Sequence, residues 1–157
     1  MKFAIIKDLN QDSMMKPILS GLLFFTLLYL LSDFFVKHSG FGLFPHALHA
    51  TLFGSEEEFL DPINKASFLE FWHVEIFFIM MILFTLSTVY IRLSKASKSA
   101  IVAVNIMMIS AITSLISLPL AFFFSSGFIN IYVVTFFIWH ILALSSALYS
   151  LKRLHYA

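Results

Sequence analysis

Cysteine is absent from this chain of 157 residues, and charge is scarce, since Asp, Glu, Lys and Arg together make up only 12% of it. Without cysteine there can be no disulfide, thiolate metal site, iron–sulfur cluster or covalently attached c-type haem. The formal net charge of +1 offers no basic surface for nucleic acid. Nucleic acid is therefore excluded as a main partner, and a metal would need His, Met, carboxylate or backbone ligands.

The motifs of soluble enzymes are also missing. The chain has no glycine-rich phosphate loop, no G-x-S-x-G and no H-E-x-x-H. The longest segment between apolar stretches, residues 37–70, leaves no room for a separate catalytic domain. We expect a single domain over residues 1–157 that is not an enzyme on its own.

Apolar residues dominate instead: 60% of the chain is hydrophobic, with 20 phenylalanines. They form four long stretches, and each reaches the ~20 residues that a helix needs to cross a ~30 Å hydrocarbon layer. The predicted fold class is an all-α integral membrane protein whose four transmembrane helices form an up-down-up-down bundle in the lipid bilayer. The first stretch continues into "SDFFVKHSG" without a cleavage site, so we expect it to be retained. The predicted helices are 17–36, 71–93, 100–124 and 128–151.

The basic residues predict an orientation. Eight of the ten Lys and Arg residues fall on one side of the predicted helices, whereas the other side carries an acidic run. By the positive-inside rule, both termini are expected in the cytoplasm, with the protein in a bacterial inner membrane. The eight basic residues are Lys2, Lys7, Lys16, Arg92, Lys95, Lys98, Lys152 and Arg153, and the outer side has Lys37, Lys65, Glu56, Glu57, Glu58 and Asp61.

The connection over residues 37–70 is long enough to hold structure of its own. It opens with the turn-forming "HSGFGLFP", after which Pro45 stands where a helix can begin, ahead of "HALHATLF". Gly54 and the acidic run end this piece. We predict a short helix at the outer membrane interface. Long loops in compact chains are often functional.

Two short motifs in this region suggest a metal site. His46 and His49 form H-x-x-H, and Glu70 and His73 form E-x-x-H. Residues three apart on a helix project from one face, so each pair could bind one ion. Imidazoles with a carboxylate suit Zn, Cu or Fe, and a b-type haem edge is a further candidate. The competing interpretation is an ordinary solvated rim of interfacial histidines, Trp72 and acidic residues.

A second candidate site lies deeper in the predicted bundle. His140 is expected near the bilayer centre with Met80 at a similar depth, a ligand pair suited to Cu(I) or haem iron. The alternative is a lone buried histidine that hydrogen-bonds a serine or threonine of helix 100–124. His73 and His140 differ in depth by roughly 10 Å, which disfavours them as axial ligands of one haem.

Glu75 and Asp33 are the ionisable residues that most need an explanation. Glu75 points about 200° away from His73 around the helix, so it does not belong to the same metal site. An ionisable residue inside a span is by default a functional-site hypothesis, here a proton route or a contact with a partner subunit. Asp33 shares a face with Tyr29, and Lys37 follows one turn later, which predicts an Asp33–Lys37 salt bridge at the outer boundary.

Three functions follow as hypotheses. The first is a redox or metal-handling component, for electron transfer or copper, which uses the outer metal site. The second is a non-catalytic subunit or assembly factor that binds a membrane-protein partner or a second copy of itself. The third is a small transporter or proton-conducting protein that uses Glu75, Asp33 and His140, although the chain lacks the paired broken helices common in carriers.

Overall fold

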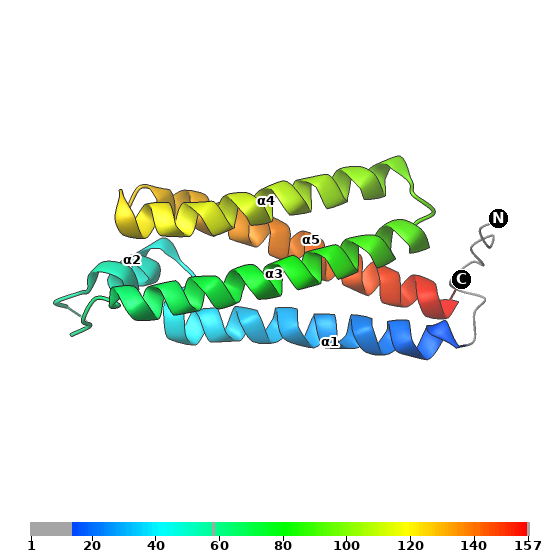
Figure 1. Ribbon diagram of the computed structural model, residues 1–157, viewed down its shortest axis with the longest axis horizontal. Helices are drawn as coiled ribbons and strands as arrows, with labels where there is room; N and C mark the ends of the chain where they lie inside the picture. The colour runs from blue at the N-terminus through cyan, green and yellow to red at the C-terminus, as the bar shows by residue number, and fades with distance from the viewer. Residues whose placement is uncertain (1–13, 58, 157) are drawn as a thin grey trace.

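The computed structural model describes residues 14–57 and 59–156, and in this part of the chain it is almost entirely helical (Figure 1). Four of the described helices are long and apolar enough to cross a membrane. The first of them continues without a break into a π-helical turn, η1, and a short helix, α2, precedes the second. The predicted all-α membrane bundle with a short helix after its first span is confirmed. The elements are α1 (Met15–Val36), η1 (Lys37–Phe41), α2 (Pro45–Phe53), α3 (Lys65–Leu93), α4 (Lys98–Phe123) and α5 (Phe128–Tyr156).

The long helices alternate in direction. α1 and α4 run toward the end of the molecule that carries α2, which we call the loop end, and α3 and α5 run back (Figure 1). The opposite end, here the terminal end, holds the start of α1, the α3–α4 turn and the end of α5. Ser20 Oγ of α1 lies 3.0 Å from His155 Nε2 of α5 at this end. α5 contacts each of α1, α2, α3 and α4, so it forms the centre of the bundle.

Two helices are longer than hydropathy predicts. α3 begins at Lys65 instead of residue 71, because the Asn64 side chain accepts a hydrogen bond of 2.9 Å from the Ser67 amide and caps a polar first turn. α5 continues past residue 151 to Tyr156 through Lys152 and Arg153, both good helix formers. Hydropathy marks the part of a helix that contacts lipid and says nothing of its polar ends.

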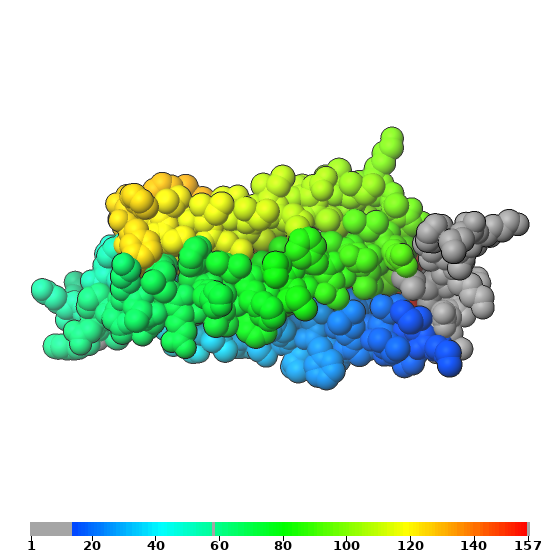
Figure 2. Space-filling view, in the orientation of Figure 1, coloured from blue at the N-terminus to red at the C-terminus, as the bar shows by residue number. Residues whose placement is uncertain are grey.

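The interior of the bundle has two apolar clusters. The larger runs along the four long helices and includes Leu30, Leu83, Met107 and Trp139. The smaller, at the loop end, packs Leu48 of α2 and Phe68 of α3 against Leu118 and Ile129. Figure 2 shows one face of the outer surface of the bundle. Many other large apolar side chains are exposed on the outside of the bundle. In a membrane-spanning bundle this outer surface faces lipid.

Gly42 connects the π-turn to α2, and both its backbone conformation and its surroundings exclude a side chain. Its amide donates a 2.8 Å hydrogen bond to the Lys37 carbonyl, which closes the turn, and its φ is +91°. A Cβ atom there would lie 2.6 Å from the Ala47 carbonyl carbon and from the Leu48 amide nitrogen. Both the backbone conformation and the close approach of α2 therefore require glycine.

Pro119 leaves one backbone carbonyl of α4 without its usual hydrogen-bond donor, and a side chain of α3 donates to that carbonyl instead. Because proline has no amide hydrogen, it cannot donate to the Leu115 carbonyl four residues earlier. The Trp72 indole Nε1 of α3 donates to that carbonyl instead, at 2.8 Å. Trp72 was expected only as part of a solvated rim; it is in fact half-buried and links two helices.

Candidate functional site

Lys37 is the centre of a buried group of charges. It is the first residue of the π-turn, and its side chain is only 3% exposed. Its Nζ lies 2.6 Å from Glu75 Oε1 of α3 and 3.1 Å from Asp33 Oδ2 of α1. It also lies 4.5 Å from the centre of the Phe136 ring. The expected Asp33–Lys37 pair is therefore present, with its lysine buried in the bundle, and Glu75 joins it.

His140 of α5 adds an imidazole beside the same aspartate. Its side chain is buried, with Nδ1 3.9 Å from Asp33 Oδ2 and Nε2 2.9 Å from the Leu30 carbonyl oxygen of α1. A carbonyl oxygen can only accept, so Nε2 carries a hydrogen and donates. The expectation that His140 bonds a serine or threonine of helix 100–124 is wrong, because α1 packs against α5 here and offers its backbone. We call Asp33, Lys37, Glu75 and His140 the charge network.

The charges in the network do not cancel. One lysine ammonium faces two carboxylates, so Asp33, Lys37 and Glu75 sum to −1 when all are ionised. Two buried atoms of the network, Glu75 Oε2 and His140 Nδ1, have no hydrogen-bond partner among the described residues. A proton bound at either atom would bring the network to neutrality. The charge network is therefore one proton short of neutrality. It has two atoms, Glu75 Oε2 and His140 Nδ1, that could bind this proton.

The seam between α1 and α3 consists of three layers. Tyr29 stacks on Phe78 with ring centres 5.3 Å apart, and toward the loop end Phe41 stacks on Phe71 at 4.1 Å. The contact of Lys37 with Glu75 lies between these aromatic layers. Each layer pairs one residue of the α1–η1 segment with one of α3. Aromatic contacts above and below thus enclose the ion pair.

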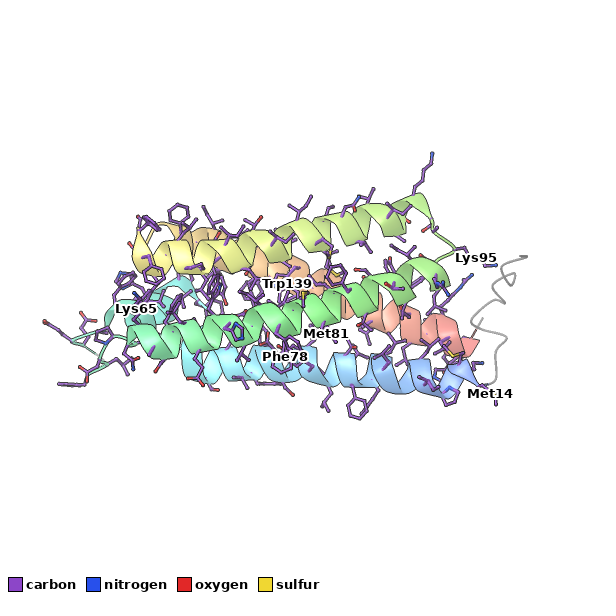
Figure 3. All side chains as sticks on the ribbon, in the orientation of Figure 1. Met14, Lys65, Phe78, Met81, Lys95 and Trp139 are labelled. Carbon is purple, nitrogen blue, oxygen red and sulfur yellow. The ribbon has the colours of Figure 1, made fainter. Side chains whose placement is uncertain are left out.

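A groove of about 350 Å³ follows this seam; we call it the α1–α3 groove. Its lining includes Tyr29, Phe71 and Phe78, with Asp33, Lys37 and Glu75 at its base. Val36 and Val74 at its edges are exposed, so the groove opens on the outside of the bundle. Figure 3 shows Phe78 between α1 and α3. Because both helices are membrane-spanning, the groove is open to lipid.

The four predicted outer metal ligands are all exposed and lie on two helices. His46 and His49 are on α2, whereas Glu70 and His73 are on α3. His49 lines a hollow beside the end of α4, and Glu70 lines the α1–α3 groove. Over residues 14–57 and 59–156, no group of three or more His, Asp or Glu residues could hold a metal ion. The four-ligand site therefore stays a prediction without support from the geometry.

The deeper predicted pair is not brought together either. Met80 is 44% exposed on the outside of α3. His140 is buried, with its ring next to those of Phe34, Phe136 and Trp139. The methionine in the core is Met107 of α4. A Met80–His140 ligand pair likewise remains a prediction.

Sequence reasoning missed the contact between Lys37 and Glu75, the central one in the network. A signal for it exists in the spacing of residues along the two helices. Lys37 and Phe41 are four residues apart, as are Glu75 and Phe71, so the two pairs match when the helices are antiparallel. An aromatic residue four positions from a base on one helix and four positions from an acid on its neighbour is the local signal for this pairing.

Comparison with known proteins places the chain in the membrane. A family model described as a transmembrane helical domain matches residues 42–156. This range contains α2 to α5, with Glu75 and His140, but not the α1–η1 segment that supplies Asp33 and Lys37. No curated protein and no solved structure matches the chain.

Proposed function

Because the chain belongs to the Aq_1264_TM family of transmembrane helical domains, it is a multi-pass membrane protein, and from that premise we propose that it is a small proton-handling protein of the transporter type. Glu75 is the group that gains and releases the proton. The observation that carries the proposal is the buried Glu75 carboxylate, which has one oxygen on Lys37 and the other without a partner among the described residues.

Stability alone does not account for such a network. A charged side chain at the centre of a span costs ~2.5–3.5 kcal/mol on insertion scales. Replacing a buried ion pair by apolar side chains of similar volume is often neutral or even stabilising. The network places three charges and an imidazole in the span, where apolar packing would serve the fold as well. The presence of the network therefore supports a functional role.

The geometry supports two protonation states of Glu75. When the carboxyl binds a proton at Oε2, it becomes neutral, and Lys37 is then balanced by Asp33 alone. When the proton leaves, Lys37 is held by both carboxylates. The ionisable groups near Glu75 are Tyr29, Asp33 and Lys37 on the α1–η1 segment and Tyr132 and His140 on α5.

Two polar features support a route to and from Glu75. On the loop side, the exposed Glu70 lines the same groove as Glu75 and lies ~7.5 Å before it along α3, which offers a polar path from the loop end. Toward the terminal end, Ser87 of α3 and Ser150 of α5 carry buried hydroxyls that have no partner in the described part of the chain. They lie ~15–18 Å beyond Glu75 and His140 along their helices. Buried polar groups of this kind bind internal water, which can carry protons.

Proton flux into liposomes tests the proposal. Purified protein is reconstituted with a pH-sensitive dye inside the vesicles, and acidification is followed after an external pH step. We expect flux above that of empty liposomes, reduced at least tenfold in Glu75→Gln and retained in the control Glu57→Gln, which removes an exposed carboxylate. Glu75→Asp keeps the carboxyl and should retain part of the flux. Wild-type flux equal to that of empty liposomes would refute the proposal.

The other hypotheses keep tests of their own. Elemental analysis of purified protein for Fe, Cu and Zn, beside a His46→Ala/His73→Ala double variant, tests the metal-handling role. Co-purification of a membrane partner tests the role as a non-catalytic subunit or assembly factor.

We also infer that the terminal end faces the cytoplasm. Arg92, Lys95, Lys98, Lys152 and Arg153 all lie near this end, which supports the inference through the positive-inside rule. Lys2, Lys7 and Glu58, which also entered the charge count, lie outside the described residues.

A further inference from the structure

We propose that the α1–α3 groove binds a lipid-soluble amine, a molecule with an apolar body and a protonated amino group that pairs with the Glu75 carboxylate. This inference rests on the proposed function and deepens it, because it names the class of ligand for which Glu75 would exchange its proton.

The walls of the groove suit an apolar body. Tyr29, Phe71, Val74 and Phe78 line it, and its volume of about 350 Å³ lies within the range of small-molecule sites. Its edges lie on membrane-spanning helices, so a ligand could enter from the lipid without crossing water. These properties favour a molecule that partitions into the bilayer.

The base of the groove suits a cation. Lys37 balances only one of the two carboxylates, so the base carries an uncompensated negative charge when Glu75 is ionised. Glu75 is just 5% exposed, and its Oε2 has no donor among the described residues. Oε2 is closed to solvent in this structure, so the Glu75 side chain would turn toward the groove to accept from an N–H group, whose positive charge then neutralises the network. A fatty acid would instead bring a second uncompensated carboxylate.

The aromatic residues add to this selectivity. Tyr29 and Phe78, which stack on each other, line the same groove as Glu75. A cation near an aromatic face is attracted by the ring's electron distribution. The site therefore offers a protonated amine three things together: a hydrogen-bond acceptor, an opposite charge and aromatic contact.

A set of decyl compounds separates these contributions. Decylammonium has both the charge and the N–H donor, decanol has a donor without charge, decyltrimethylammonium has charge without a donor, and decanoate has the opposite charge. If the groove binds as proposed, decylammonium binds at least tenfold more tightly than each of the other three. Equal binding of decanol or decyltrimethylammonium would overturn the proposal.

The experiment measures saturable binding of radiolabelled decylammonium to full-length protein in lipid nanodiscs, with empty nanodiscs subtracted. The unlabelled decyl compounds are the competitors. We expect about one site per chain, with affinity reduced at least tenfold in Glu75→Gln. Val74→Trp, which fills the groove edge and leaves the carboxylate in place, should also lose binding. Val102→Trp, a similar change at an exposed residue of α4, should keep it.

The outcomes of this experiment differ from those of the flux assay. Binding that is the same in wild type, Glu75→Gln and Val74→Trp would show partition into lipid and would refute the groove. Proton flux that depends on Glu75, without amine binding, would refute this inference alone. Amine binding without proton flux would support the groove and refute the proposed proton function.

Discussion

Lys37 is the residue that makes the polar interior of this bundle possible. It provides the lysine ammonium that lies between Asp33 and Glu75, and its own charge is buried in turn. A buried pair that loses one partner leaves an uncompensated charge, whereas loss of both partners removes the problem. The contribution of Lys37 is therefore conditional on the carboxylates around it.

We predict that Lys37→Met destabilises the protein by ~3–5 kcal/mol, because it leaves two carboxylates without their cation. Thermal unfolding in detergent should show the loss as a lower midpoint. Lys65→Met, which removes an exposed lysine 5.7 Å from the Phe123 ring, is the matched control and should change stability little. The double variant Lys37→Met/Glu75→Met should recover part of the loss, because only Asp33 is then left without its cation. A fully stable single variant would show that Lys37 is not required as the counter-charge.

At this scale the sequence predicts separate residues better than their partners. The i,i+4 spacing predicts the Asp33–Lys37 pair, and the apolar context of Glu75 predicts that it needs a partner. The contact of Lys37 with Glu75 joins residues 38 positions apart. It depends on how α1 and α3 are rotated against each other, which spacing within one helix does not fix. The same limit applies to the H-x-x-H and E-x-x-H motifs. Each motif places two side chains on one helix, but whether the two pairs come together depends on the path of the loop between the helices.

Among the elements, α4 lacks one of its backbone hydrogen bonds, and a side chain of α3 replaces it. The Leu115 carbonyl loses its usual donor at Pro119 and receives one from Trp72 on α3. Hydropathy predicted the existence of α3 and α4, and a proline inside a helix removes one backbone donor. No local pattern predicted that an indole from a neighbouring helix would replace it. The π-turn after α1 was missed for a related reason, because Gly40 within it and Gly42 just after it favour an irregular turn in any local analysis.

We predict that Trp72→Phe destabilises the protein by about 1 kcal/mol beyond the loss of ring area, since it leaves the part-buried Leu115 carbonyl with one hydrogen bond fewer. In Pro119→Ala the backbone amide returns, and the same Trp72→Phe change should then cost less. A double-mutant cycle measured by unfolding in detergent gives this difference directly. Equal costs of Trp72→Phe in both backgrounds would contradict the repair of α4 by Trp72.

For the whole molecule, the arrangement in the membrane gives a prediction of its own. The native chain has no cysteine, so single cysteines can be introduced without background. We expect a membrane-impermeant maleimide to label Ser126→Cys, in the loop-end turn, from outside intact cells. Lys98→Cys, at the terminal end, should be labelled only after the cells are opened. The reverse pattern would invert the proposed orientation and leave the fold unchanged.

The position of the charge network within the span makes it sensitive to membrane voltage. Glu75 follows Lys65, the first residue of the 29-residue α3, by ten positions, so it lies roughly a third of the way along the helix from the loop end. Moving a unit charge across the whole membrane changes its free energy by ~2.3 kcal/mol at a voltage of ~100 mV. A proton that reaches Glu75 from the loop side crosses about a third of that voltage, so its free energy changes by about 0.8 kcal/mol. This corresponds to a roughly fourfold change in the occupancy of Glu75. In the proposed orientation, an inside-negative voltage draws protons toward this carboxylate. The electric field of the cell would therefore set the protonation of Glu75 together with the external proton concentration.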